Sequence, residues 1–385
     1  MARSVQAYRG VEQGPIRPPS EAASLLVRVT RNCPWNKCSF CPVYKGTRFS
    51  RRPVEHVLAD IDAVAQHVYA AMGRVDEAEA IAQERRQSFP DLPQEDVLAA
   101  GIAWSWYQTG MKSVFLQDAN SLAIRAADMI RILQHMRMRF PWIERITTYA
   151  RSHTLATHLN DEDLSAMEAA GLNRIHVGFE SGSNQVLAMV DKGATKAMHI
   201  EAGQRVKRSG IELSAYYMPG LGGEDLWEEN ARETADVMNQ VDPDYIRLRS
   251  LAVPDHVPLA DDLRIGSFRR PNDELMAREI LLFVESLDGI TSFVRSDHIL
   301  NLFQDLEGRL PEDKEHMASI PRAFLEMDPE RRVLYQVGRR WGIFAGVVDM
   351  WDPQRLAQAE RLVRRLGATP TNIDEIVDEQ VKRFI

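Results

Sequence analysis

Residues 31–41 read Arg-Asn-Cys-Pro-Trp-Asn-Lys-Cys-Ser-Phe-Cys and contain all three cysteines of the chain, Cys33, Cys38 and Cys41. Three soft thiolates in one loop can bind three irons of a 4Fe-4S cluster and leave the fourth iron open to another ligand. A structural zinc site would take a fourth protein ligand. The chain has no fourth cysteine, and the next histidine, His56, is fifteen residues beyond Cys41. A disulfide would leave one thiol over and is typical of secreted proteins. The residues therefore favour an iron–sulfur cluster, with zinc or buried cysteines as the alternatives.

The composition is that of a globular protein with a large core. Of 385 residues, 44% are hydrophobic and 26% charged, and the net charge is −8. This acidic balance argues against nucleic acid as the partner, although it leaves room for a local basic patch. The first residues lack the apolar segment of a signal peptide, and no apolar run is long enough for a membrane-spanning helix. We therefore expect a cytoplasmic protein, in a reducing compartment that suits an iron–sulfur cluster.

Short β-branched segments alternate with helical patterns from residue 24 onward, which predicts an α/β fold with a parallel sheet. Six strands are expected, at 24–30, 113–117, 145–150, 174–179, 212–217 and 244–250. A helix is expected between the third and fourth strands, over Asp161–Ala170, with Asn160 or Asp161 as its cap. Residues 53–112 are too long for a single crossover and should form two or three helices, interrupted near Pro90–Pro93.

The chain is expected to divide into an N-terminal extension, a partial barrel and a C-terminal module, at 1–23, 24–250 and 251–385. The barrel would include the helical insertion at about 53–112. Prolines after residue 251 mark an irregular connection, and apolar residues then recur at helical spacing, so the module should be mostly α-helical. Within it, Asp297-His298 is expected to start a helix and Gly338–Trp341 to form a surface turn, with substrate contact as the alternative for the turn.

The sixth expected strand has one apolar face and one polar face. Ile246 and Leu248 alternate with Arg247 and Arg249, and the third and fourth strands alternate in the same way. Parallel strands that helices cover on both faces should be almost wholly apolar. The alternation therefore predicts a curved sheet whose concave face holds a polar ligand.

A cysteine loop directly after the first strand of a six-unit β/α chain resembles the radical S-adenosylmethionine (SAM) superfamily. The usual spacing of that family is C-x3-C-x-aromatic-C, whereas this chain has C-x4-C-x2-C, with Phe40 at the aromatic position. The resemblance covers about residues 24–250 and implies a partial (β/α)6 TIM-like barrel. It also implies a 4Fe-4S cluster on Cys33, Cys38 and Cys41, with SAM bound at the open iron and Phe40 beside the cofactors.

Two glycine-containing segments strengthen the resemblance. Gly178-Phe-Glu-Ser-Gly-Ser183 is similar to a segment of the branch that includes methylthiotransferases and cobalamin-binding members. Met218-Pro-Gly-Leu-Gly-Gly-Glu224 resembles the turn after the fifth strand that contacts adenine. Either segment alone would be read as a flexible turn, and the glutamate as a helix cap. The SAM contacts implied here are Glu180, Ser181, Met218, Gly220 and Gly222.

The ends of the second and third strands supply further expected SAM contacts. The family often has Gly-Gly-Glu after the second strand, and here the chain reads Gln117-Asp-Ala-Asn-Ser121. A backbone carbonyl, Asp118 or Asn120 is therefore expected to meet the amino group of SAM. Arg151 and Ser152 follow the third strand and can reach its carboxylate, with an exposed ion pair as the alternative.

The resemblance implies an enzyme that cleaves SAM reductively to methionine and a 5′-deoxyadenosyl radical, which abstracts hydrogen from a small organic substrate. It also implies an electron donor such as flavodoxin or ferredoxin. We expect Arg247 and Arg249 to point inward, with Glu180 or Glu212 neutralising one of them. The other would bind the SAM carboxylate or an acidic group of the substrate, which is therefore expected to be anionic.

Two alternatives remain open at this point. One is an RNA-modifying enzyme, supported by the basic residues that follow the cluster loop, Lys45, Arg48, Arg51 and Arg52. The other is a non-catalytic iron–sulfur protein, an electron carrier or scaffold that keeps the fold. The two glycine-containing segments favour an enzyme, because an electron carrier needs no SAM pocket.

Overall fold

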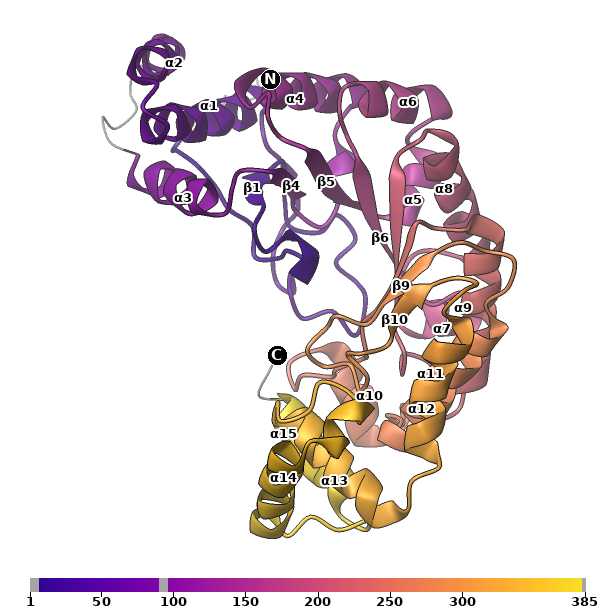
Figure 1. Ribbon diagram of the computed structural model, residues 1–385. Coiled ribbons are helices and arrows are strands. Elements are labelled where there is room, and N and C mark those ends of the chain that lie inside the picture. Colours follow the sequence, from indigo (N-terminus) through magenta and orange to yellow (C-terminus); the bar gives the residue numbers. More distant parts are fainter. Residues whose placement is uncertain (1–6, 90–95, 383–385) are drawn as a thin grey trace. The chain divides into compact units, whose positions relative to one another are not determined.

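The structure, a computed structural model, describes residues 7–89 and 96–382 (Figure 1). The chain falls into two compact units. The first contains Met1–Pro34, Gly46–His176 and Arg205–Glu212, and the second contains Trp35–Lys45, Val177–Gln204 and Leu213–Ile385. The chain changes from one unit to the other five times. One of these changes falls inside the cysteine loop, between Pro34 and Trp35, and another falls inside a strand, between His176 and Val177.

The sheet of the first unit is parallel. Strand β4 (Ser113–Gln117) lies between β1 (Leu25–Arg28) and β5 (Arg145–Ala150), and β6 (Arg174–Glu180) follows β5 in the sheet order. A separate antiparallel pair joins β2 (Thr30–Arg31) to β3 (Ser50–Arg51), with Thr30 opposite Arg51. This pair brings together the two ends of the segment that contains the cysteines.

Three helices lie in the described part of the long connection before β4, as predicted. They are α1 (Val54–Ala71), α2 (Val75–Ser88) and α3 (Val97–Gln108), and α1 packs on both of the others. The expected interruption at Pro90–Pro93 lies outside the described residues. The unit also contains α4 (Ala126–Arg139), α5 (Ser152–Thr157) and α6 (Asp161–Ala169). Asn160 caps α6, as expected, through a reciprocal bond with Asp163.

The sheet of the second unit runs from the end of β6 through β7 (Glu212–Tyr217), β8 (Tyr245–Leu248), β9 (Phe293–Arg295) and β10 (Glu307–Arg309). Strands β7, β8 and β9 are parallel, and β10 is antiparallel to β9. Helices α7 (Asn184–Met189), α8 (Lys196–Arg208) and α9 (Trp227–Val241) connect the first strands of this series. All six predicted strands are present, whereas β9 and β10 were missed, because three residues are too few to show an alternation.

Residues 251–382 are mostly helical, as expected. Their helices are α10 (Pro258–Ile265), α11 (Asp273–Ser286), α12 (Lys314–Leu325), α13 (Pro329–Arg340), α14 (Pro353–Leu366) and α15 (Ile373–Val381). Helix α11 packs on α9 and α12, and α13 packs on α14 and α15. Because β9 pairs with β8, the sheet continues past residue 250. The expected domain bounds at residues 23/24 and 250/251 stay a prediction.

The fold is therefore α/β, with a mostly parallel sheet and a helical C-terminal region, as the sequence predicts. Within the part of the chain that the structure describes, no helix combines the length and the apolar character needed to cross a membrane.

Candidate functional site

The carboxyl ends of β6, β7 and β8 are joined to one another by backbone hydrogen bonds. Met218 N donates to Glu180 O at 2.8 Å, and Arg249 N donates to Tyr217 O at 2.9 Å. The segment after β6, the glycine-rich turn after β7 and the residue after β8 therefore form one row at the edge of the sheet. The carboxyl ends of parallel strands are where α/β proteins place their binding sites.

Glu180 ends β6 in a left-handed backbone conformation, with φ of 65°. This conformation is uncommon for a residue other than glycine, and such residues cluster at functional sites. Its carboxylate lies 3.1 Å from Lys192 Nζ, which in turn lies 5.8 Å from the centre of the Phe40 ring. A Cβ at Gly178 would overlap the Glu180 carboxylate, so the glycine leaves room for it. The helix that follows is capped by Ser183 instead, which removes the alternative of Glu180 as a cap.

The rest of this segment is packed tightly against α9. Ser181 is fully buried and its Oγ accepts from Ser183 N at 3.0 Å. Gly182 N donates to Thr234 Oγ1 at 2.7 Å, and a Cβ at Gly182 would overlap the Glu233 carbonyl. Gly-x-Glu-Ser-Gly-Ser is therefore a rigid turn here. It presents Glu180 and buries Ser181.

The glycine-rich turn is held by a glutamate that the sequence analysis did not identify. Glu279 of α11 is fully buried, and its Oε2 accepts from Gly220 N at 2.9 Å. Its Oε1 accepts from Tyr217 OH and Asn230 Nδ2, each at 2.7 Å. Burial raises the pKa of Glu279 to about 7, although these hydrogen bonds lower it. The apolar spacing predicted helix α11 correctly. It did not indicate that a polar residue lies on the buried face of this helix.

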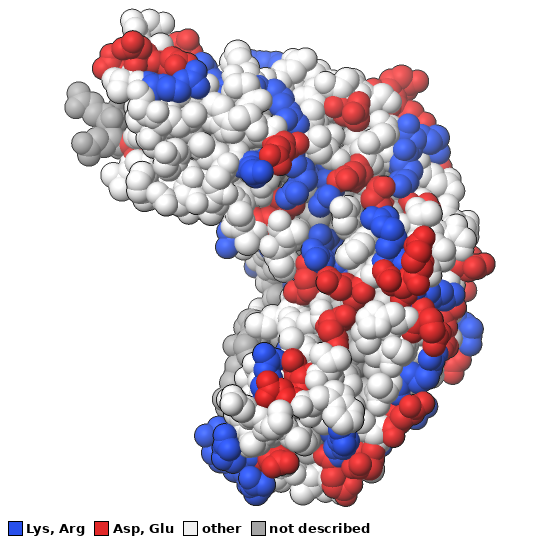
Figure 2. All heavy atoms as spheres, viewed as in Figure 1, with Lys and Arg blue, Asp and Glu red and all other residues white. Residues whose placement is uncertain are grey.

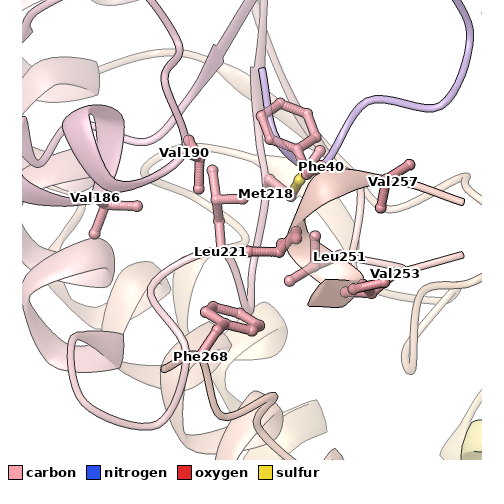
Figure 3. Close-up of a cluster of buried hydrophobic side chains, with 11 residues drawn as sticks. Phe40, Val186, Val190, Met218, Leu221, Leu251, Val253, Val257 and Phe268 are labelled. Carbon is pink, nitrogen blue, oxygen red and sulfur yellow. The ribbon is translucent and has the colours of Figure 1, made fainter. Parts of the chain in front are cut away.

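An apolar cluster joins the cysteine loop to the glycine-rich turn. Phe40, Met218 and Leu221 belong to this cluster, which Figure 3 shows in close-up, and the side chains of Cys38 and Cys41 pack against it. Phe40 and Met218 are both at most 8% exposed. Two of the three cysteines therefore share one core with the turn that resembles an adenine-binding element.

The second half of the cysteine loop is fixed by several hydrogen bonds. Ser39 N donates to Val190 O at 2.9 Å, and Ser39 O accepts from Leu259 N at 3.0 Å. Trp35 Nε1 donates to Asp191 O at 2.7 Å. The loop is therefore tied to the segment that follows α7, on the side where Lys192 also lies. Trp35 is one of the four residues between the first two cysteines, where the usual spacing has three.

The first unit places Asp118 and Cys33 at the other end of the loop. The Asp118 carboxylate is fully buried and pairs with Arg28 at 2.7 Å. It also accepts from Asn32 N at 3.1 Å, directly before Cys33, where Asn32 has φ of 66°. Asp118 therefore positions the start of the cysteine loop. Its expected contact with the SAM amino group stays a prediction.

Asn120, Arg151 and Ser152 lie together at the ends of β4 and β5. Asn120 is buried, accepts from Arg151 N at 3.3 Å and donates to Thr154 Oγ1 at 2.8 Å. Arg151 precedes α5, and Ser152, its first residue, is buried. The structure thus brings these three predicted residues together in the first unit. Their contact with SAM stays a prediction.

Arg247 lies in β8, and its guanidinium already has protein partners. Its Nη1 lies 2.6 Å from Asp297 Oδ2, its Nε donates to Ser214 Oγ at 3.2 Å, and the residue is 2% exposed. Asp297 therefore neutralises Arg247, where the sequence analysis expected Glu180 or Glu212. That expectation was wrong, because Asp297 is 50 residues away along the chain and belongs to an irregular segment rather than the expected helix start.

The two expected partners bind other cations. Glu180 faces Lys192, and Glu212 lies 2.7 Å from Arg174. Arg249, by contrast, is exposed, and it forms no ion pair with the described residues. Arg249, rather than Arg247, is therefore the arginine that remains available to a ligand.

The donor set of the loop fits a 4Fe-4S cluster. All three cysteine side chains are partly buried, and they lie within nine residues of one another in the sequence. Within residues 7–89 and 96–382, no group of three or more His, Cys, Asp or Glu side chains converges as a single metal ion would require. A 4Fe-4S cluster takes each thiolate on a different iron, so its ligands do not converge on one point. Cys33, Cys38 and Cys41 would hold the cluster.

A model described as the radical SAM superfamily matches residues 27–235. The chain is 23% identical, over 296 residues, to tRNA uridine(34) acetyltransferase of Methanocaldococcus jannaschii, covering 74% of this chain and 52% of that protein. It is 25% identical, over 238 residues, to tRNA-2-methylthio-N(6)-dimethylallyladenosine synthase of Syntrophus aciditrophicus, covering 58% and 40%. The chain thus spans about half the length, or less, of these curated relatives.

Among solved structures, methylornithine synthase has a TM-score of 0.43 at 13% identity, covering 72% of this chain and 66% of that chain. Coproporphyrinogen III oxidase from Escherichia coli, described as a radical SAM enzyme, has a TM-score of 0.39 at 15% identity, covering 67% and 58%.

Proposed function

The chain belongs to the radical SAM superfamily, and on that premise we propose that it is an enzyme that abstracts hydrogen from a small, anionic organic substrate. When bound, the family's 4Fe-4S cluster and SAM supply a 5′-deoxyadenosyl radical for that step. We further propose that the enzyme works in the reducing cytoplasm and takes its electron from a donor such as flavodoxin or ferredoxin.

The observation that carries the proposal is the shared apolar cluster. Cys38 and Cys41 pack against the same buried side chains as the glycine-rich turn, with Phe40 and Met218 among them. A cluster ligand and an adenine-binding turn must be close, because SAM has to meet both. An electron carrier needs a cluster loop but has no use for such a turn, so the arrangement favours the enzyme.

Glu180 supports the same conclusion. Its left-handed backbone places a carboxylate at the strand end, in the row that includes the glycine-rich turn. A carboxylate there suits an ammonium group or the ribose hydroxyls of SAM. Lys192 fixes this carboxylate from one side and packs near Phe40, so the residue is oriented before a ligand arrives.

Anaerobic reconstitution tests the proposal. The wild-type chain should bind about four irons and, with SAM and dithionite, form 5′-deoxyadenosine that mass spectrometry detects. The variant with Cys33→Ala, Cys38→Ala and Cys41→Ala should bind almost no iron and form no product. A matched control is Lys112→Gln, which changes an exposed lysine that pairs with Glu144. Cluster-loaded, reduced wild type that never forms 5′-deoxyadenosine would make the carrier or scaffold the better account.

RNA modification is the second candidate, and the relatives favour it. The names of several relatives describe modification of tRNA. The relatives therefore do not support the argument that the negative net charge excludes a nucleic-acid substrate. A surface hollow of about 430 Å³ is lined by Arg31, Arg48, Phe49 and Ser50. Arg31 pairs with Glu12 at 2.6 Å, which leaves Arg48 and the ring of Phe49 as the groups that suit a stacked base.

The basic run after the cysteine loop supports RNA binding less than the sequence suggested. Arg52 is buried and pairs with Asp60 at 2.5 Å, and Arg51 Nε donates to the Ala123 carbonyl. Of the four cations only Arg48 is exposed on the hollow. On the face shown in Figure 2, basic side chains are interspersed with acidic ones. We therefore keep the small anion as the main proposal.

One comparison separates the two candidates. Total RNA and a protein-free metabolite extract from the same cells are added separately, and the rate of 5′-deoxyadenosine formation is measured. Stimulation by the metabolite fraction, retained after ribonuclease treatment, supports the small substrate. Stimulation by RNA that ribonuclease removes makes RNA modification the function.

A further inference from the structure

Arg339 of α13 is a buried cation without an ion-pair partner among the described residues. It is 4% exposed, its Nη2 donates to Ile299 O at 2.7 Å, and its Nε has no hydrogen-bond partner. Asp273 and Asp305 act on it only beyond ion-pair distance, and Asp273 already pairs with the neighbouring Arg340. A buried guanidinium without a counter-charge is costly, so an anionic ligand is the natural partner.

The segment that Arg339 contacts offers a second donor. Arg340 Nη1 donates to Leu300 O at 2.6 Å, so the two arginines of α13 hold residues 299–300. His298, directly before this segment, accepts from Leu300 N at Nδ1, 3.3 Å away. This contact leaves the proton on Nε2. Burial, and then Arg249, lower the pKa of His298 to about 4, so the ring is neutral at pH 7 and carries its proton on Nε2.

Arg249 is held beside this segment by Asn301, whose Oδ1 accepts from Ser250 N and whose Nδ2 donates to the Leu248 carbonyl, each at 2.8 Å. It follows the last residue of β8, is exposed, and acts electrostatically on His298, as Arg339 does. Asp297 could compensate this charge, but it is held by Arg247. The next residue, Ser250, has a buried Oγ without a hydrogen-bond partner. One cation directly after β8 and one on α13 thus act on the same imidazole, and neither forms an ion pair with a carboxylate of the described residues.

The position of this cluster connects it to the site already described. Arg249 N is bonded to the Tyr217 carbonyl, directly before the glycine-rich turn that begins at Met218. Arg249 therefore stands in the row of strand ends that also contains Glu180. A group bound by Arg249 would lie beside a ligand of that row.

We propose that Arg249, His298 and Arg339 form an oxyanion site that binds a phosphate or carboxylate group of the substrate. The proposal rests on the proposed function for the identity of the ligand. Arginine suits the task because its planar fork binds an oxyanion with two parallel hydrogen bonds. Arg339 is fixed by its contact with the Ile299 carbonyl, whereas the exposed Arg249 gives access from solvent.

The site is tested with inorganic phosphate as the probe. Cluster-loaded protein without SAM is titrated calorimetrically with phosphate at constant ionic strength, and a parallel titration uses acetate. We expect saturable binding to wild type that weakens about tenfold or more in Arg249→Gln and Arg339→Gln, since each loses a charge-assisted hydrogen bond. Arg278→Gln, an exposed arginine of α11 that pairs with Glu274, should bind as wild type does. Preference for phosphate or for acetate identifies which oxyanion the site takes.

Three outcomes would overturn the proposal. The first is wild-type protein that shows no saturable binding of either anion. The second is an equal loss of anion affinity in Arg278→Gln, which would indicate that the anions respond to the overall charge of the protein rather than to a specific site. The third is SAM binding that weakens in Arg249→Gln as much as phosphate binding does, which would assign the site to the carboxylate of SAM. If Arg339→Gln fails to fold, the exposed Arg249→Gln still decides, and Arg339→Lys keeps the charge without the fork.

The anion titration needs neither SAM nor reductant. Phosphate binding without formation of 5′-deoxyadenosine would therefore support this site and refute the proposed function. Formation of 5′-deoxyadenosine without anion binding would refute only the site.

Discussion

Trp35 lies directly against Gly193: a Cβ at Gly193 would overlap the indole ring. Trp35 Nε1 also donates to Asp191 O at 2.7 Å, and Gly193 has φ of 62°. The cysteine loop has one residue more than the usual spacing between its first two cysteines, and Trp35 lies in that stretch. The indole therefore anchors the longer loop on the turn that follows α7.

Gly193→Ala should disturb the cysteine loop. A methyl group there must displace the Trp35 ring, and overpacking of this kind costs about 1–3 kcal/mol. The left-handed backbone adds roughly 1–2 kcal/mol of strain. We expect a lower iron content per chain after anaerobic reconstitution, together with a lower free energy of unfolding.

Gly289→Ala is the matched control, because Gly289 has φ of 69° with nothing near its missing Cβ. This variant should have a lower free energy of unfolding because of the backbone strain, but it should bind as much iron per chain as wild type. Equal iron content in both variants would mean that the contact with Trp35 does not position the loop.

Glu279 should make stability depend on pH. Its pKa is about 7 in the folded chain, above the ordinary value of 4.5, so the folded state holds this proton more tightly than the unfolded state. The contribution of this proton to the free energy of unfolding is complete below about pH 4.5 and is lost as the pH rises towards 7. At 1.36 kcal/mol per pKa unit, it amounts to about 3 kcal/mol at most.

Urea unfolding of wild type and Glu279→Gln at pH 5 and pH 7.5 measures this effect. The wild type should lose stability relative to the variant as pH rises. Glu285→Gln removes an exposed carboxylate from the same helix and serves as the control. A difference between wild type and Glu279→Gln that is the same at both pH values would rule out a raised pKa.

Glu180→Gln should weaken SAM binding while leaving the cluster in place. The substitution keeps the shape but removes the charge that faces Lys192. Loss of a charge-assisted contact costs about 1.5–3 kcal/mol, which corresponds to a weakening of about tenfold or more. Calorimetric titration of SAM into cluster-loaded protein measures the change, with Lys112→Gln as the control. Unchanged SAM affinity, at unchanged iron content, would remove Glu180 from the SAM site.

The sequence predicts those features that depend on local patterns. Strands with a clear alternation were found, and 113–117, 145–150 and 212–217 have the predicted bounds. The cap at Asn160 was also found, because capping needs only neighbouring residues. The two short strands β9 and β10 carry no such pattern and were missed.

The partners of buried charges could not be read from the sequence. Arg247 and Asp297 are 50 residues apart, and nothing in either segment indicates that they meet. Arg339 was expected in a surface turn and is buried, because the packing of α13 decides its exposure. Glu279 belongs to a helix that the sequence shows only as an apolar pattern. Its role in holding the glycine-rich turn follows from its hydrogen bonds with Tyr217 and Gly220, which the sequence does not indicate.

The central claim is that the cysteine loop holds a cluster whose open iron meets SAM. Electron paramagnetic resonance of the reduced, cluster-loaded wild-type chain tests it most directly, with spectra recorded before and after SAM is added. We predict that SAM changes the spectrum of the reduced cluster, because it binds at the open iron. A reduced 4Fe-4S spectrum that saturating SAM leaves unchanged would contradict the account.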